Sequence, residues 1–110
     1  MYKVCSLFAG VGGIDLGFLE TKQCNVVYAN EFDLYAVKTY ELNFDTKVDN
    51  RDIHQVKVDE IPDFDIMIGG FPCTSFSVAG YRKGFDDDRT GDLFFEMERI
   101  FKERKPRVVF

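Results

Sequence analysis

The stretch YKVCSLFAGVGG, residues 2–13, decides the fold. Its first part, residues 2–8, is mostly apolar and predicts a short buried strand. Residues 9–13 hold three glycines, which predict a tight turn, and apolar side chains at helical spacing follow over residues 14–19. A strand that passes through such a turn into a helix lets the backbone approach a ligand closely, although the same glycines would also suit a turn without a ligand.

Strand and helix patterns alternate along the rest of the chain. We expect strands at residues 24–29, 47–49, 64–68 and from 108, helices at 33–43 and 93–105, and a long loop at 69–92. This alternation predicts an α/β fold: a doubly wound sheet of about five parallel strands with flanking helices. Ligands of such sheets bind beyond the carboxyl ends of the strands. The chain ends inside the last strand, so we expect an incomplete sheet, arising from a truncation, a split gene or an excised domain.

Composition limits the class of protein. The chain has 110 residues, 45% of them hydrophobic, which fits one domain or part of one. The net charge of -5 argues against a simple basic nucleic-acid-binding module, but not against a DNA enzyme whose basic surface lies elsewhere. The odd number of cysteines, three, argues against a disulfide framework and for the reducing cytoplasm. No apolar run approaches the roughly 20 residues of a membrane helix.

Two acidic positions suggest a site for an adenosyl-type cofactor. Glu31 lies 18 residues beyond Gly13, at the end of the second expected strand, where an acidic residue binds ribose hydroxyls in nucleotide-binding folds. The glycine spacing differs from that of dinucleotide folds, which argues against NAD. After the short third strand, Asp52 could accept a hydrogen bond from an adenine amino group, with Ile53 covering the ring. Position alone favours a plainer role for Asp52, as a helix N-cap.

Cys73 is the candidate nucleophile. It follows a strand and two glycines in a polar loop, whereas Cys5 and Cys24 fall in apolar strand patterns and are expected in the core. The single histidine, His54, could form a dyad with Cys73, but its neighbours favour a surface position. With one histidine and no Cys-x-x-Cys, we expect no zinc site. Arg89, in the same loop, could contact phosphates or be an ordinary solvated charge.

Taken together, six segments resemble the bacterial DNA (cytosine-5) methyltransferases of restriction–modification systems. They are SLFAGVGG (6–13), NEF (30–32), RDI (51–53), GGFPCTSFSVAG (69–80), KGFDDDRTGDLFFE (83–96) and KPRVVF (105–110). Single segments are weak signals, but their order and spacing together are highly specific.

The resemblance implies a Rossmann-like sheet that binds S-adenosylmethionine, and it assigns roles to individual residues. The residues implied for the cofactor are Phe8, Gly10, Gly12, Gly13, Glu31, Phe32, Asp52, Ile53 and Pro72. Within this set, Glu31 would bind the ribose, Asp52 and Ile53 the adenine, and Phe32 replaces the adenine-stacking tryptophan of the family. Cys73 would be the nucleophile, and Ser77 and Arg89 would lie near the DNA.

The implied reaction is methyl transfer to carbon 5 of a flipped cytosine through a covalent cysteine adduct. Residues 1–110 would then be the N-terminal part of the catalytic domain, without the target-recognition domain and without the glutamate that stabilises the adduct. The expected partners are DNA and a second polypeptide or C-terminal part that completes the domain, with no membrane and no metal. Two alternatives remain: an RNA cytosine-5 methyltransferase, and a non-catalytic fragment that binds the cofactor or a partner.

Overall fold

The computed structural model describes the backbone of residues 1–70 and 88–110, and the side chains of residues 1–70 and 93–110. The described strands form one parallel sheet in the order β3-β2-β1-β4-β5. Their bounds are Tyr2–Leu7 (β1), Cys24–Asn30 (β2), Val48–Asp49 (β3), Ile66–Gly69 (β4) and Val108–Val109 (β5). The predicted α/β class and the five parallel strands are confirmed.

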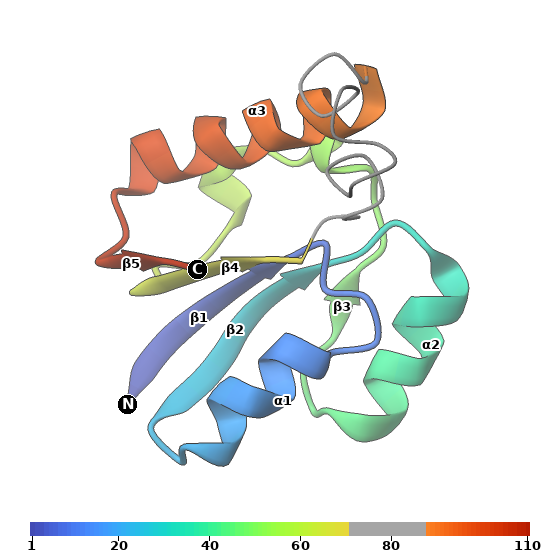
Figure 1. The fold of residues 1–110 in the computed structure, drawn as a ribbon, viewed down its shortest axis with the longest axis vertical. Helices are drawn as coiled ribbons and strands as arrows, with labels where there is room; N and C mark the ends of the chain where they lie inside the picture. The colour runs from blue at the N-terminus through green and yellow to red at the C-terminus, as the bar shows by residue number, and fades with distance from the viewer. Residues whose placement is uncertain (71–87) are drawn as a thin grey trace, which may run out of the picture.

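Helices cover both faces of the sheet (Figure 1). On one face lie α1 (Gly13–Glu20) and α2 (Leu34–Asn43), and on the other lies α3 (Asp88–Arg104). Two short 3-10 helices, η1 (Ile53–Gln55) and η2 (Val58–Glu60), connect β3 to β4 and contact α3. None of the described helices is long and apolar enough to cross a membrane.

Each face of the sheet has its own apolar core. One core joins the sheet to α3 and the 3-10 helices and includes Cys5, Met67 and Ile100. The other lies beneath α1 and α2 and includes Cys24 and Tyr40. The expectation that Cys5 and Cys24 belong to the core is therefore confirmed, and burial raises the pKa of the Cys5 thiol to about 12.

The strand register sets the position of the candidate site. Leu7 pairs with Asn30 of β2 and with Gly69 of β4, so the three strands end at the same level. The register of β1 and β2 shifts by one residue after Val4, which leaves Val27 without a partner in β1. Residues that directly follow the strands therefore meet at one edge of the sheet.

Two element boundaries differ from the sequence prediction by more than one residue. The last helix begins at Asp88, five residues earlier than expected, so the predicted loop ends sooner. Gly91 and the charged residues around it suggested a loop, but a single glycine only weakens a helix and carboxylates suit a first helical turn. Strand β4 begins at Ile66 and not at Phe64, although Phe64 is buried in the core beside it.

We expect α3 to owe its position to Ile100, whose side chain is fully buried. Replacing Ile100 by alanine should lower the free energy of unfolding by about 2–5 kcal/mol, since it leaves a cavity in the core. Phe95→Ala, on the same helix, is the control because Phe95 is exposed. Urea denaturation followed by circular dichroism measures both variants, and equal losses would contradict this packing.

Candidate cofactor-binding site

The turn after β1 contains two glycines with left-handed backbone, and they serve different purposes. Gly12 has φ 95° and is buried, and a Cβ atom there would collide with the Phe44 ring. Gly10 has φ 60°, but a Cβ atom there would meet nothing within 4 Å. Gly12 is therefore required by the packing of the turn against α2, whereas Gly10 leaves bare backbone facing open space.

Glu31 ties this turn to the start of α2. Its Oε1 accepts a hydrogen bond from the backbone N–H of Gly10 at 2.8 Å, and its Oε2 accepts one from Asp33 N–H at 2.8 Å. A carboxylate oxygen has two lone pairs, so each oxygen can accept a further hydrogen bond. Glu31 can therefore hold the turn and bind a hydroxyl group at the same time.

Asp52 takes the N-cap role that its position in the sequence favoured. It is the N-cap of η1, where its Oδ1 accepts a hydrogen bond from His54 N–H at 3.0 Å. The same oxygen lies 2.5 Å from Nδ1 of the His54 ring. These two contacts, the backbone one first, lower the pKa of the Asp52 carboxyl group. The predicted cap is confirmed, and Asp52 also faces the cavity described next.

A cavity of about 550 Å³ opens at the carboxyl edge of the sheet. Six of the predicted cofactor residues line it: Phe8, Gly10, Glu31, Phe32, Asp52 and Ile53. Six residues without a predicted role complete the described lining: Asn30, Asp33, Ala36, His54, Gly70 and Leu93. Gly12 and Gly13 are not among the lining residues and act through the shape of the turn. The structure thus gathers residues from β2, α2, η1 and α3, and from the segments that follow β1 and β4, around one cavity.

The character of this cavity fits an adenosyl group. Phe32 is 70% exposed and Ile53 is buried, so apolar surface is available to the faces of a flat ring. Glu31 and Asp52 supply acceptors, and the backbone at Gly10 lies open to a ligand. Acceptors suit the ribose hydroxyls and the adenine amino group, which are all donors.

Asn30 was missed by the sequence analysis, although it belongs to the quoted NEF segment. Its side chain is almost fully buried, and its Nδ2 donates to the backbone oxygens of Asp49 and Arg51, at 3.0 and 3.1 Å. Asn30 thereby ties the end of β2 to the chain that leads into Asp52. A polar residue at the end of an apolar strand was the signal that could have identified it.

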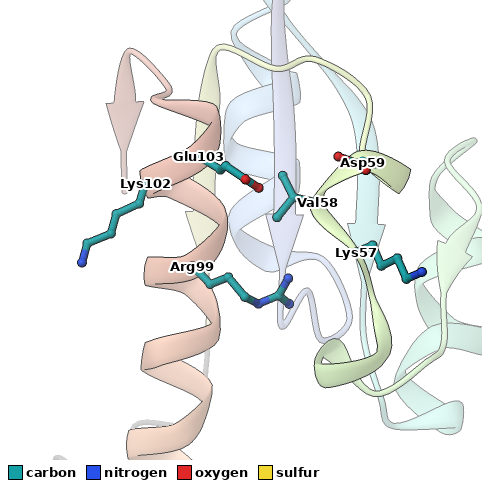
Figure 2. A pocket seen from close by; sticks show the side chains of 6 residues that line it. All are labelled: Lys57, Val58, Asp59, Arg99, Lys102 and Glu103. Carbon is teal, nitrogen blue, oxygen red and sulfur yellow. The ribbon is translucent and has the colours of Figure 1, made fainter.

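A second cavity, of about 590 Å³, lies between α3 and the segment of η2 (Figure 2). It contains none of the predicted site residues, and its lining mixes cations with carboxylates: Lys57, Val58, Asp59, Arg99, Lys102 and Glu103. Arg99 is already engaged there, because it pairs with Glu96 and donates to the backbone oxygens of Ile53 and Val56. The cavity at the sheet edge is therefore the stronger candidate for a functional site.

For four of the predicted residues the structure does not describe the side chain. Pro72, Cys73 and Ser77 lie outside the described residues, and so does any dyad of Cys73 with His54. Arg89 falls in the first turn of α3, but its side chain lies outside the description. The described chain on either side of this segment reaches the cavity, through Gly70 and Leu93.

The fold and this site define a class of protein: an α/β domain that binds a nucleotide-type cofactor at the carboxyl edge of a parallel sheet. The sequence model of the C-5 cytosine-specific DNA methylases matches residues 2–110. The chain belongs to this family.

Three relatives illustrate the match. The chain is 56% identical over 110 residues to the type II methyltransferase M.Bsp6I of Bacillus sp. (strain RFL6), covering all of this chain and 35% of the relative. It is 52% identical over 108 residues to the type II methyltransferase M.HhaI of Haemophilus parahaemolyticus, covering 98% of this chain and 32% of the relative. A crystal structure of a prophage-encoded DNA modification methyltransferase of E. coli superposes on this chain with a TM-score of 0.78 at 29% identity. The match covers 96% of this chain and 30% of the other. The chain thus spans about a third of the length of these proteins.

A buried polar network fixes α1 and α2 beneath the glycine turn. Asp15, in the first turn of α1, is 1% exposed, and its carboxylate accepts hydrogen bonds from Ser6 Oγ at 3.0 Å and Tyr40 Oη at 2.5 Å. Burial and the contact with Asp15 raise the pKa of Tyr40, so its hydroxyl remains a donor. The Tyr40 ring also packs against Phe44, which contacts Gly12.

Tyr40→Phe should lower the free energy of unfolding by about 1–3 kcal/mol, because the buried Asp15 carboxylate loses a donor. The matched control is Tyr35→Phe on the same helix, since Tyr35 is 80% exposed and should tolerate the change. Chemical denaturation at neutral pH measures both. If the two variants were equally stable, the network would not contribute as described.

Asp49 and Arg51 brace the segment that carries Asp52. Asp49 accepts hydrogen bonds from the Arg51 guanidinium and from Tyr28 Oη, and Arg51 also pairs with Glu60. The contact with Arg51 is the main reason that the pKa of Asp49 falls from 3.8 to about 2. Since Asp49 is easier to ionise in the folded chain, it stabilises the fold above pH 4, and this contribution is lost as the pH falls towards 2.

In Asp49→Asn, stability should therefore fall less between pH 4 and pH 2 than it does in the wild type. Urea denaturation at several pH values measures this difference. Asp45→Asn is the control, because Asp45 is exposed and should leave the wild-type profile intact. Identical profiles for the wild type and Asp49→Asn would contradict the brace.

Proposed function

We propose that this chain is the cofactor-binding and nucleophile-bearing part of a DNA cytosine-5 methyltransferase of a restriction–modification system. The observation that carries the proposal is the cavity that Glu31, hydrogen-bonded to Gly10, lines together with Asp52 and Ile53. Family membership supports DNA as the substrate over RNA, because the family description names DNA. Cytoplasmic action fits the buried free thiols of Cys5 and Cys24.

S-adenosylmethionine, when bound, supplies a methyl group from its positively charged sulfonium sulfur, which leaves as a neutral thioether. The residues of this chain would hold it by the ribose at Glu31, by the adenine amino group at Asp52, and by the adenine faces at Ile53 and Phe32. The open backbone at Gly10 would lie against the cofactor. These residues would hold the cofactor at the carboxyl edge of the sheet, where Gly70 also lines the cavity.

Cys73 is proposed as the nucleophile. It follows Gly70 by three residues, a span of at most about 11 Å of extended chain, and Gly70 lines the cavity. Its thiolate would add to carbon 6 of cytosine, forming a sulfur–carbon bond and moving an electron pair to carbon 5. Carbon 5 then takes the methyl group, a base removes its proton, and the electron pair left behind expels Cys73 as thiolate. Base stacking hides carbon 6, so the cytosine must first be flipped out of the duplex.

Other parts are needed for the whole reaction. The relatives are about three times as long as this chain, and the side chains of Val108, Val109 and Phe110 at the β5 edge are exposed. We therefore propose that residues 1–110 form the N-terminal part of the catalytic domain. A C-terminal part or a second polypeptide would complete the sheet and read the DNA target. Ser77 and Arg89 are proposed to lie near the DNA.

Glu31→Ala should weaken the binding of S-adenosylhomocysteine about 10-fold or more, because the ribose loses its acceptor and Gly10 loses its anchor. Isothermal titration calorimetry measures the dissociation constants. Glu20→Ala is the control, since Glu20 is exposed at the end of α1. Equal binding by the wild type and Glu31→Ala would contradict the ribose assignment, provided that both are folded by circular dichroism.

Cys73→Ser should abolish a covalent complex with DNA that carries 5-fluorocytosine, because fluorine at carbon 5 blocks the release of the cysteine. The test uses a chimera in which residues 1–110 replace the matching segment of M.Bsp6I, 56% identical, with the DNA target of that relative. Gel electrophoresis under denaturing conditions detects the complex. Cys24→Ala should still form it, since Cys24 is buried. A complex with Cys73→Ser as abundant as that of the parent chimera would refute the assignment.

A further inference from the structure

The two oxygens of the Asp52 carboxylate have different surroundings. Oδ1 accepts the backbone N–H of His54 at 3.0 Å and lies 2.5 Å from Nδ1 of the same residue. Within the part of the chain that the structure describes, no hydrogen bond reaches Oδ2. Both Asp52 and His54 line the cofactor cavity. One oxygen is thus used inside the 3-10 turn, and the other is available to a ligand.

The backbone beneath this pair is held from two other elements. Arg99 reaches from α3 to the backbone oxygens of Ile53 and Val56, at 3.2 and 3.0 Å, and Figure 2 shows its side chain directed away from α3 into the cavity beside the short helices. Asn30, at the end of β2, donates to the backbone oxygen of Arg51 at 3.1 Å. The backbone on each side of Asp52 is therefore fixed, and the remaining freedom is rotation of its carboxylate. The His54 ring removes that freedom.

The chemistry of the pair selects the kind of base that the cavity accepts. A ring nitrogen within hydrogen-bond distance of a carboxylate oxygen carries the proton, so the His54 ring donates and Asp52 accepts. The two contacts from His54 hold the pKa of Asp52 below its usual range, so the carboxylate stays ionised and can only accept. An adenine amino group is a matching donor. The carbonyl oxygen that hypoxanthine has at the same position would meet Oδ2 as acceptor against acceptor.

We propose that His54 is a specificity-determining residue, which orients Asp52 so that its Oδ2 reads the amino group of adenine. This inference rests on the proposed function, because it assigns a residue to the adenine end of the same cavity. His54 acts through Asp52 and is therefore a positioning residue. Its predicted signature is a change in the preference for adenine over hypoxanthine, which a purely structural role would not produce.

The test compares two ligands by isothermal titration calorimetry: S-adenosylhomocysteine and S-inosylhomocysteine. In the second, a carbonyl oxygen replaces the amino group of the base and the neighbouring ring nitrogen carries a proton. The wild type should prefer the adenosyl compound by about 30-fold or more, since the carbonyl oxygen of the inosyl compound would face the Asp52 carboxylate as acceptor against acceptor. His54→Ala should reduce this preference to about 5-fold or less, mainly through weaker adenosyl binding. Gln55→Ala, an exposed neighbour in the same 3-10 turn, should keep the wild-type preference.

A conservative variant separates orientation from folding. In His54→Asn the side-chain amide can donate to Asp52 as Nδ1 does, so this variant should recover most of the wild-type preference. The His54 side chain is 39% exposed, so all three variants should unfold at the wild-type temperature. If His54→Ala kept the wild-type preference, or if the wild type bound both ligands equally, the inference would be wrong and the proposed function would stand. Binding of neither ligand by the wild type would overturn both.

Discussion

The carboxylate of Glu31 is the interaction on which the candidate site depends. It connects the glycine turn after β1 with the start of α2, so two segments that are distant in the sequence share one anchor. This contact requires that the parallel strands β1 and β2 end at the same level of the sheet, because only then do the residues that follow them meet. A single side chain thus shapes the turn, and in the proposed function it would also offer acceptors to the cofactor.

This dual use is repeated around the cavity. Asp52 caps a 3-10 turn with one carboxylate oxygen, and it also lines the cavity. Asn30 fixes the chain that precedes Asp52, while Arg99 fixes the chain that follows it. The site is preorganised by hydrogen bonds to backbone atoms.

The sequence predicted the parts of the site that follow local rules. Glycines before a helix, an acid at the end of the next strand and an aspartate before a short turn have fixed positions along the chain, and the topology places them together. His54 and Leu93 could not be predicted in this way, because they reach the cavity only through the packing of η1 and α3. Asp15 was also missed, since an acid in a first helical turn is usually solvated, and its buried partner Tyr40 lies 25 residues away.

The register shift in β2 has a consequence for where Glu31 points. Before the shift, Cys24 and Val26 face the α1 and α2 side, as alternate residues of a strand do; then Val27 and Tyr28 both pack towards the α3 side. Every later residue of the strand has therefore changed parity, and Ala29 returns to the α1 and α2 side. By the same count Glu31 falls on the side of the glycine turn. The direction of the Glu31 carboxylate is therefore set by the number of residues in β2. If the strand were one residue shorter, the carboxylate would point to the α3 side of the sheet, away from the glycine turn.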